Sequence, residues 1–400
     1  MGTADSLNAT AAQQNTTPIA NQTLSKSQLG DSDNTTAGSE DIVHVVWSDS
    51  TPTTPEIFHR RAGGLFDPTA RITLSNIPGV TQVLGEWPAI AISGPEVYVV
   101  WHDTTGEGTP FDIWLRKSED GGATFGSPIN VSNDPGDSIR PKIAVAGQFV
   151  YIVWEDNGSI LFAKSTDRGA TFSSSMILSN TIFGNNGSPT IAAPRARHVF
   201  ISWHNLQTED IWFIKSADFG ATFGSPINVS NDDVFSFSPK IAVDVSNVYL
   251  VWITGPIPPQ EIRFSRSTDG GVTFDASQLI GNGTWPAIAA TANDNTAYVT
   301  WVDNGDLRFR RSTDGGATFE FPRRVINNPG TAFHPAIAAS DSLPGNVYIV
   351  WVDQAPTNPN NEIFFVRSRD SGSHFEPFST NLSLNAGSSD RPAIAILDLR

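Results

Sequence analysis

The stretch RSTDGGATF, residues 311–319, decides the fold of this chain because it is one copy of a repeated phrase. Its variants are KSEDGGATF (117–125), KSTDRGATF (164–172), KSADFGATF (215–223), RSTDGGVTF (266–274) and RSRDSGSHF (367–375). An active site is built once, whereas a phrase that returns at near-even spacing belongs to a repeat architecture. We therefore predict a structural turn, in which the Asp accepts backbone N–H groups and the Gly supplies a positive φ.

Each repeat is predicted to be one blade of a β-propeller. Residues 285–328 contain four β-rich runs (PAIAA, AYVTWVD, DLRFRRS and RRVIN), separated by turn signals such as Asp-Asn-Gly and Asp-Gly-Gly. Four short strands in a unit of about 50 residues are typical of a propeller blade. Two further features each occur seven times. A Trp recurs at Trp47, Trp101, Trp154, Trp203, Trp252, Trp301 and Trp351. A P-x-I-A run begins at Pro88, Pro141, Pro189, Pro239, Pro286, Pro335 and Pro392.

The offset between these two series indicates how the ring closes. The first Trp has no P-x-I-A run before it, and the last run, in RPAIAILDLR (391–400), has no Trp after it. Residues 391–397 are therefore predicted to be the innermost strand of a blade whose other strands are 42–48, 56–61 and 70–75. The prediction is an all-β, seven-bladed propeller over residues 41–400, with no open strand edge at the seam. The seven Trp residues are predicted to be core.

Residues 1–40 differ in composition from the repeats. They are mostly Asn, Thr, Ser, Gln, Ala and Asp, which predicts a disordered linker or stalk. They hold N-x-[ST] sequons at Asn8, Asn15, Asn21 and Asn34 but no apolar signal-peptide region. Together with the acidity and the absence of Cys, this favours a secreted or cell-surface chain whose signal peptide is not part of this sequence.

The composition also argues against two classes of partner, nucleic acids and the membrane interior. The net charge of −16, without a basic stripe, argues against a nucleic-acid partner. No apolar run approaches the roughly 18 residues of a membrane span, so no transmembrane segment is expected.

The S-x-D-x-G-x-x-[FW] pattern of the six stretches resembles the Asp-box, or BNR repeat, of the sialidase superfamily. The resemblance covers residues 87–387 and, by ring closure, 41–400. The first blade departs from it, since RRAGGLF (60–66) lacks the Ser and the Asp. In that family the Asp-box is a structural turn. Strand parity places these turns, between strands three and four, on the bottom face, so function is expected at the opposite, top face.

The resemblance implies a fold more securely than a reaction. Known sialidases are six-bladed, with three arginines on the substrate carboxylate, an Asp acid/base and a Tyr–Glu nucleophile pair. This chain has seven repeats and no Arg-Ile-Pro motif, the nearest phrases being Arg140-Pro141 and Arg391-Pro392. A tyrosine-dependent sialidase mechanism is not expected, because all five tyrosines share one strand-two register typical of packing residues: Tyr98, Tyr151, Tyr249, Tyr298 and Tyr348.

The position before each P-x-I-A proline lies at the predicted central mouth of the top face. It is occupied by Trp87, Arg140, Ser188, Ser238, Trp285, His334 and Arg391, and the preceding loops add Glu86, Asp137, Phe333 and Asp390. Aromatic rings that stack on sugars and charged groups that bind hydroxyls or a uronate suit a glycan. The predicted ligand-binding residues are Trp87, Arg140, Trp285, His334, Asp390 and Arg391. The alternative is that the Trp and Arg side chains only fill the channel.

Acidic residues flank the loops between strands two and three, as the pairs Asp49/Glu56, Asp103/Asp112, Asp303/Asp306 and Asp353/Glu362. In Asp303-Asn304-Gly305-Asp306 a type I′ turn is predicted, which sets two carboxylates opposite each other. Ca²⁺ would compensate, with Asp303, Asp306, Asp103 and Asp112 as candidate ligands. The favoured alternative is that each Asp accepts loop N–H groups or pairs with an Arg of the next blade. No other cofactor is expected.

The seven histidines show no metal-binding spacing. His102 and His204 follow the repeated Trp in alternate blades and are expected to face solvent at the rim.

These patterns predict an extracellular or cell-surface propeller that recognises a glycan at the top-face mouth, with no catalytic residues identified. One alternative is a glycoside-cleaving enzyme. A sialidase-like hydrolase needs two carboxylates about 5–10 Å apart, and a polysaccharide lyase needs a His or Tyr base beside an Arg. The other alternative is a surface scaffold or protein-interaction module without a small-molecule site.

Overall fold

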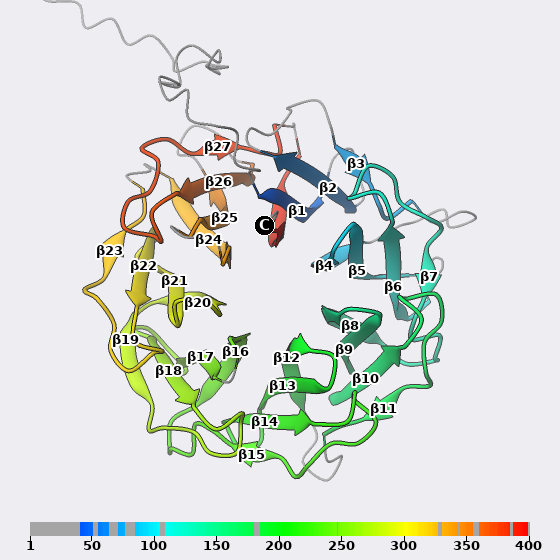
Figure 1. Ribbon diagram of the computed structural model, residues 1–400, viewed down its shortest axis with the longest axis horizontal. Helices are drawn as coiled ribbons and strands as arrows, with labels where there is room; N and C mark the ends of the chain where they lie inside the picture. Colours follow the sequence, from blue (N-terminus) through cyan, green and yellow to red (C-terminus); the bar gives the residue numbers. More distant parts are fainter. Residues whose placement is uncertain are drawn as a thin grey trace, which may run out of the picture. The chain divides into compact units, whose positions relative to one another are not determined.

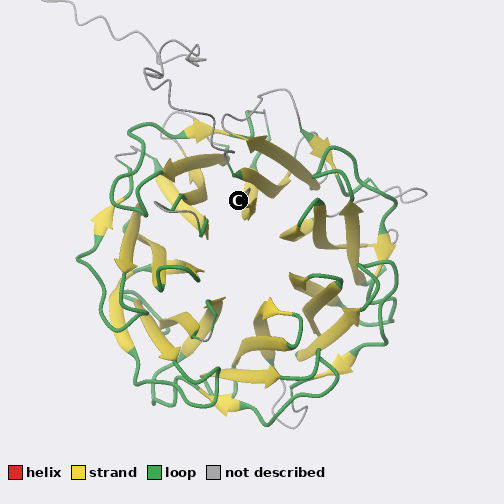
Figure 2. Ribbon diagram, viewed as in Figure 1, coloured by secondary structure: helices red, strands yellow, loops and turns green. Residues whose placement is uncertain are grey.

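The computed structural model describes residues 41–400 apart from 51–54, 64–70, 77–84, 105–108, 180–184, 246, 327–329, 342–344, 355–359, 385–386 and 399–400. The described residues form seven four-stranded antiparallel sheets arranged in a ring (Figure 1). They consist of strands and loops without a helix (Figure 2), so none of them forms a helix that could cross a membrane. The predicted seven-bladed propeller is confirmed. The predicted linker, residues 1–40, lies outside the described residues.

Each blade has an inner, a second, a third and an outer strand, and the blades are numbered 1 to 7 in the order given. The inner strands are β28 (Ser389–Leu397), β4 (Glu86–Ser93), β8 (Ser138–Ala146), β12 (Asn186–Arg195), β16 (Ser236–Val243), β20 (Thr284–Thr291) and β24 (Thr331–Ala339). The second strands are β1 (Ile42–Asp49), β5 (Glu96–Thr104), β9 (Phe149–Asp156), β13 (His198–Asn205), β17 (Val248–Thr254), β21 (Thr296–Asp303) and β25 (Val347–Gln354). The third strands are β2 (Glu56–Gly63), β6 (Phe111–Ser118), β10 (Ser159–Ser165), β14 (Asp210–Ser216), β18 (Glu261–Ser267), β22 (Asp306–Ser312) and β26 (Glu362–Ser368). The outer strands are β3 (Ile72–Thr73), β7 (Ile129–Asn130), β11 (Met176–Ile177), β15 (Ile227–Asn228), β19 (Gln278–Asn282), β23 (Arg323–Arg324) and β27 (Thr380–Asn381).

The ring closes as the offset predicted. Strand β28, from the C-terminus, pairs antiparallel with β1, so that Val45 lies opposite Ile394. Side chains reinforce the seam, where Ser389 Oγ donates to Asp49 Oδ2 at 2.7 Å. Ile394 and Ile396 pack against the apolar cluster shared by blades 7 and 1. The closing strand thus contributes both ladder hydrogen bonds and core contacts.

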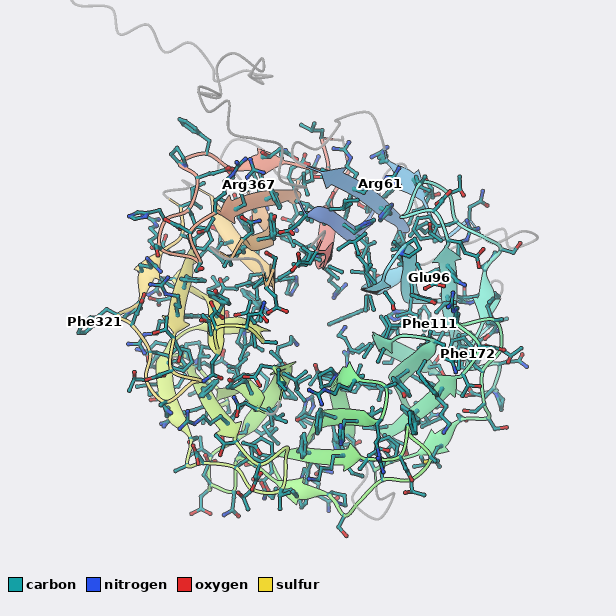
Figure 3. The ribbon with its side chains drawn as sticks, in the orientation of Figure 1. Arg61, Glu96, Phe111, Phe172, Phe321 and Arg367 are labelled. Carbon is teal, nitrogen blue, oxygen red and sulfur yellow. The ribbon has the colours of Figure 1, made fainter. Side chains whose placement is uncertain are left out.

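The core lies between adjacent blades. All seven repeated Trp side chains are buried, as predicted, and the second strands are almost entirely buried because a neighbouring blade covers each face. The five tyrosines are buried too. Four of their hydroxyl groups, those of Tyr98, Tyr151, Tyr249 and Tyr348, form hydrogen bonds; Tyr98, for example, donates to the Arg168 carbonyl of the next blade at 3.3 Å. At the outer edge apolar side chains can be left in solvent, and Phe321 projects outward with 91% exposure (Figure 3).

The repeated stretch is a hydrogen-bonded turn between the third and outer strands. In residues 311–319, the Gly316 N–H donates to Ser312 Oγ at 2.8 Å, and the Thr318 N–H donates to Asp314 Oδ1 at 2.9 Å. Thr318 Oγ1 donates to Asp314 Oδ2 at 2.6 Å. Partial burial raises the pKa of the Asp314 carboxyl, but these donors lower it by more, so the pKa lies below the ordinary value. The predicted structural role is confirmed, whereas identity with the Asp-box of the sialidase superfamily stays a prediction.

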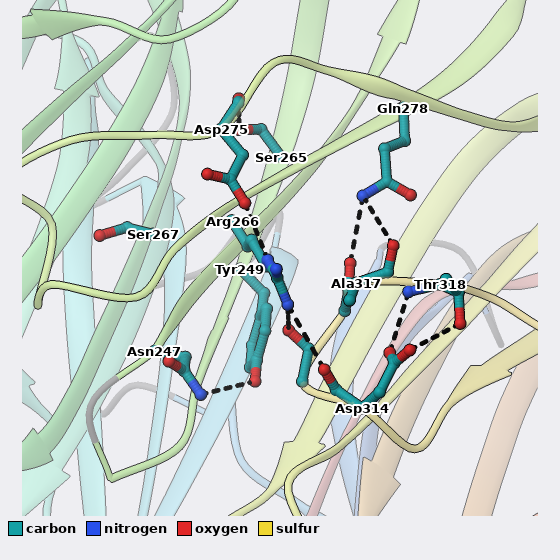
Figure 4. A network of polar contacts seen from close by, with 12 residues as sticks. Asn247, Tyr249, Ser265, Arg266, Ser267, Asp275, Gln278, Asp314, Ala317 and Thr318 are labelled. Carbon is teal, nitrogen blue, oxygen red and sulfur yellow. Dashed lines mark hydrogen bonds and ion pairs between the residues drawn. The ribbon is translucent and has the colours of Figure 1, made fainter.

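Each turn also locks one blade to the next. Arg266 of blade 5 binds Asp275 in its own blade and donates to the carbonyls of Asp314 and Gly315 in blade 6 (Figure 4). A Cβ on Gly316 would lie 2.6 Å from Cζ of Phe264, a ring of blade 5. Glycine is required there both by the positive φ of 77° and by this close approach.

Blade 1 departs from the repeat in its packing as well as its turn. Blades 3 to 7 stack an aromatic of the second strand on one of the third, as in Tyr151–Phe162 at 6.1 Å between ring centroids. In blade 1 the same two register positions hold His44 and His59, whose rings lie 5.3 Å apart. A hydrogen bond of 3.0 Å joins His44 Nδ1 and His59 Nε2. The seam blade therefore has a buried histidine pair where the repeat has an apolar stack.

Candidate functional site at the channel mouth

A β-bulge shapes the mouth in every blade. In blade 2, Glu86 pairs with His102 and Ala89 with Val100, so that Trp87 and Pro88 together oppose the one residue between. The residue before the proline has a positive φ in all seven blades, between 44° and 53°: Trp87, Arg140, Ser188, Ser238, Trp285, His334 and Arg391. A non-glycine residue pays about 1–2 kcal/mol for this conformation. Its sevenfold repetition makes it a property of the fold, which delivers one side chain per blade to the mouth.

Two arginines converge on one indole. The Arg391 guanidinium carbon lies 4.0 Å from the Trp87 ring centroid, and that of Arg140 lies 5.0 Å from it. Arg140 Nη1 also binds Glu155 at 2.9 Å, and Arg391 Nη1 binds Glu86 at 3.4 Å. Cation–π attraction and the carboxylates together hold the two guanidinium planes in place.

On the other side of Arg391 lies a His–Asp pair. His334 Nδ1 donates to Asp390 Oδ1 at 2.7 Å. Burial raises the pKa of Asp390. This hydrogen bond and the charge of Arg391 lower it by more, so the pKa of Asp390 lies below its ordinary value. The His334 ring meets Trp285 edge to face at 5.1 Å between centroids. Asp390 thereby orients His334 and connects it to the arginine.

All six predicted ligand-binding residues belong to one connected chain of contacts, here called the mouth arc. It runs from Trp285 through His334, Asp390, Arg391 and Trp87 to Arg140. Every side chain in it is partly exposed, so the arc faces solvent. Phe333 packs on Trp285 and Glu86 binds Arg391, as expected of neighbours. Asp137 does not join the arc, because it accepts the N–H of Phe111 at 3.0 Å.

The expectation that His102 and His204 face solvent is wrong. They are only 4% and 8% exposed. The reason is visible at His102, whose Nδ1 accepts the N–H of Arg140 at 3.2 Å and so lies beneath the bulge of the next blade. Burial, with the nearby charges of Arg391 and Arg140, lowers the pKa of His102 to about 3. Burial likewise lowers the pKa of His204 to about 4.

Three further residues of the site were missed from the sequence. Glu155 occupies the same post-Trp position as His102, accepts the N–H of Ser188 and binds Arg140. Lys142 and Lys240 stand at the variable position of P-x-I-A, where the other five blades have Ala or Thr. Comparison of the repeats at these two positions would have found all three.

The acidic pair Asp303/Asp306 is compensated by arginines. The two residues are cross-strand partners around Asn304 and Gly305, whose φ values of 52° and 83° fit the predicted type I′ turn. Arg308 Nη2 lies 3.3 Å from Asp306, Arg308 Nε lies 3.5 Å from Asp303, and Arg324 also binds Asp306. These arginines come from the same blade, not from the next one as the alternative to Ca²⁺ supposed.

Hydrogen bonds occupy the pair Asp103/Asp112 in a similar way. Asp103 accepts the Thr104 N–H at 2.8 Å, and Asp112 accepts Ser132 Oγ at 2.8 Å and Asn130 Nδ2 at 3.0 Å. In the part of the chain that the structure describes, no three His, Cys, Asp or Glu residues are grouped so that they could hold a metal ion.

Comparison with known proteins supports the fold. No protein-family model and no curated protein sequence matches the chain. Among solved structures, it resembles an α-L-arabinofuranosidase of Fusarium graminearum (TM-score 0.52, 13% identity, 72% of this chain and 93% of that chain). It also resembles the leech intramolecular trans-sialidase (0.52, 11%, 78% and 68%) and the NanB sialidase of Streptococcus pneumoniae (0.50, 9%, 84% and 71%). At such identities the likeness shows the fold alone, which is a sialidase-like propeller.

Proposed function

We propose that this propeller recognises acidic glycans at the mouth arc, in an extracellular or cell-surface setting. The observation that carries the proposal is the placement of two guanidinium groups on one partly exposed indole, 4.0 and 5.0 Å from its centroid. Planar guanidinium groups suit the paired oxygens of a carboxylate or sulfate, and indoles suit sugar rings.

Arg140 and Arg391 have N–H groups that take no part in the hydrogen bonds described above. A guanidinium carries five N–H groups. Among the described residues, the side-chain hydrogen bonds of Arg140 and Arg391 use only Nη1 of each. Nε of Arg391 is buried, so the donors left for a ligand are chiefly the Nη2 groups. Trp87 keeps the two guanidinium planes fixed before a ligand arrives, which lowers the entropy lost on binding.

Calorimetric binding to acidic oligosaccharides tests the proposal. Arg391→Gln should weaken binding by about 10- to 100-fold, since a hydrogen bond to a charged group contributes roughly 1.5–3 kcal/mol. Trp87→Ala should weaken it as well while costing less stability than Trp101→Ala, because Trp101 is fully buried. Arg197→Gln, which removes a guanidinium that binds the Ala217 carbonyl outside the mouth arc, is the matched control. Unchanged binding in both mouth variants would overturn the proposal.

The His334–Asp390 pair favours lyase chemistry as a second candidate. Asp390 binds Nδ1 of His334, so a neutral His334 has the lone pair on Nε2 as its basic site. With Arg391 beside it to neutralise a uronate, that nitrogen would take the proton from the carbon next to the carboxylate. The freed electron pair would form a carbon–carbon double bond as the bond to the leaving sugar oxygen breaks, and water would supply the proton to that oxygen. The double bond of the product absorbs ultraviolet light. Loss of that signal in His334→Gln, with binding retained, would support catalysis, and no signal from wild type would leave recognition alone.

A further inference from the structure

A groove lies beside the channel mouth, over the neighbouring blades 4 and 5 (Figure 1). It has a volume of about 380 Å³ and is here called the side groove. Its lining comes from the loop between β13 and β14, the loop between β15 and β16, and the loop between β17 and β18: Glu209, Asp233, Val234, Phe235 and Pro256. A volume of this size falls in the range of small-molecule sites.

Comparison of two repeats shows that the fold does not require the apolar lining. The sequence INVSND stands at 129–134 in blade 2 and at 227–232 in blade 4. Blade 2 continues with Pro-Gly-Asp (135–137), whereas blade 4 continues with Asp-Val-Phe (233–235), and both then enter the next inner strand with Ser. Val234 is 44% exposed. An apolar side chain thus meets solvent where the equivalent loop has a glycine, which is typical of a binding surface.

The side groove adjoins the mouth where the large mouth residues are interrupted. The mouth position is Ser in blades 4 and 5, but Trp, Arg or His in the other five blades. The Ser236 N–H donates to the Glu209 carbonyl at 2.8 Å, and the Phe235 ring lies 5.1 Å from the Phe237 ring between centroids. Ser236 and Phe237 directly precede Ser238, the mouth residue of blade 5. The groove lining therefore contacts the strand end that forms the low side of the mouth.

Hydrogen bonds hold the three loops in place. Asn205 Oδ1 accepts the N–H groups of Gln207 and Thr208 at 2.9 and 2.8 Å, which orders the loop of blade 4. The Gly255 N–H donates to the Phe235 carbonyl at 2.9 Å, which ties the loop of blade 5 to the segment between the blades. Walls that are fixed before a ligand arrives lower the entropy lost on binding.

The charge of the side groove is opposite to that of the arginines in the mouth arc. Within the described part of the chain, the carboxylates of Glu209 and Asp233 have no hydrogen bond or ion pair. They can accept hydrogen bonds from hydroxyl or ammonium groups, and they repel a carboxylate or sulfate. Phe235 offers an aromatic surface beside them, as sites that hold sugar rings do.

We propose that the side groove binds the sugar next to the acidic sugar held by the mouth arc, and that this second sugar is neutral or carries an amine. The inference rests on the proposed function and names its substrate class, a glycan in which an acidic sugar is joined to a non-acidic one. The low side of the mouth, formed by Ser188 and Ser238, gives the chain its path from one site to the other. A polymer of acidic sugars alone does not match this pair of sites.

Calorimetric titration of the wild type tests the pairing. The probes are methyl glucuronide, two disaccharides that join glucuronic acid to glucose in either order, and diglucuronic acid. The better glucose-containing disaccharide should bind at least about tenfold tighter than methyl glucuronide, because its hydroxyl groups gain hydrogen bonds to charged acceptors. Diglucuronic acid should show no such gain.

The outcomes separate this inference from the proposed function. If methyl glucuronide binds and neither glucose-containing disaccharide improves on it, the side groove holds no sugar, while acidic recognition at the mouth arc stands. An equal gain for diglucuronic acid would likewise overturn the inference. If none of these sugars binds, the proposed function and the inference are both wrong.

Two variants assign the gain to the side groove. Glu209→Gln with Asp233→Asn keeps the side-chain shapes and removes both charges, so diglucuronic acid should bind tighter to it than to the wild type. Val234→Gly with Phe235→Asp introduces the residues of the blade 2 loop, and it should remove the advantage of the disaccharide over methyl glucuronide. Wild-type affinity ratios in both variants would overturn the inference.

A control accounts for the change in net charge. Glu119→Gln with Glu320→Gln removes two carboxylates that bind Lys117 and Arg311 near the repeated turns, away from the mouth. It should keep the wild-type affinity ratios among the probes. If it matches the charge-removed groove variant, the discrimination comes from the net charge of the protein and the inference is wrong.

Discussion

Replacement of the His44–His59 pair by two phenylalanines should make the propeller markedly more stable in acid. Both histidines are buried, and burial lowers the pKa of His44 to about 4 and, together with the charge of His44, that of His59 to about 3. The ordinary pKa of a histidine side chain is 6.5. Between these values the unfolded chain binds more protons than the native chain, so the free energy of unfolding falls as the pH falls.

The size of the effect follows from the linkage relation. One pKa unit corresponds to about 1.4 kcal/mol, and pH 5 lies about 1.5 units below the unfolded pKa, so each histidine loses about 2 kcal/mol between pH 7.5 and pH 5. The pair therefore accounts for about 4 kcal/mol, a large part of a typical stability of 5–15 kcal/mol. The loss begins below pH 6.5 and ends near the folded pKa values. His102 and His204 add a similar dependence that the substitution leaves in place.

Urea denaturation at pH 7.5 and pH 5 measures this difference. The variant His44→Phe with His59→Phe restores the kind of stack that blade 4 has in Phe200–Phe213, with centroids 6.0 Å apart. It also removes two ring nitrogens, His44 Nε2 and His59 Nδ1, that are buried without a hydrogen-bond partner. His374→Thr, which returns an exposed turn position to the repeat consensus, is the control. If wild type and double variant lose stability in parallel between the two pH values, the pair is not held neutral in the native state.

Three further predictions concern the architecture. Deletion of residues 391–400 should lower the Tm sharply, because it removes most of β28, exposes the inner edge of β1 and uncovers the apolar cluster on which Ile394 and Ile396 pack; an unchanged Tm would contradict ring closure. Melting curves in EDTA and in millimolar Ca²⁺ should coincide, since arginines and hydrogen-bond donors already compensate Asp303, Asp306, Asp103 and Asp112; stabilisation by Ca²⁺ would restore the metal hypothesis. Gly316→Ala should cost at least 1 kcal/mol in urea denaturation, from its φ of 77° and the 2.6 Å approach to Phe264, and a neutral effect would refute the packing argument.

The repeat made the fold predictable. Seven copies each of the Trp and P-x-I-A patterns indicated the number of blades, and the offset between Trp47 and Pro392 indicated which strand closes the ring. The Asp of the turn was predicted as an acceptor because its partners lie within four residues. Predictions of this kind succeed where the physical cause is local or repeated.

Contacts between blades, and contacts within a blade that depend on side-chain rotamers, were not predictable in this way. His102 is buried because the bulge of the next blade covers it, and nothing within its own repeat indicates this. Arg308 and Arg324 compensate Asp306 from within the blade, which depends on rotamers that the sequence does not specify.

The central claim, recognition of an acidic glycan by the mouth arc, is tested most directly by one calorimetric comparison. An acidic oligosaccharide and its counterpart with the carboxyl reduced to an alcohol are titrated into the wild-type propeller at low and at physiological salt. The Arg140–Trp87–Arg391 arrangement predicts binding of the acidic form at least about tenfold tighter, with an advantage that shrinks as salt rises. Equal affinity for the two forms, or binding of neither across a panel of acidic glycans, would contradict the claim.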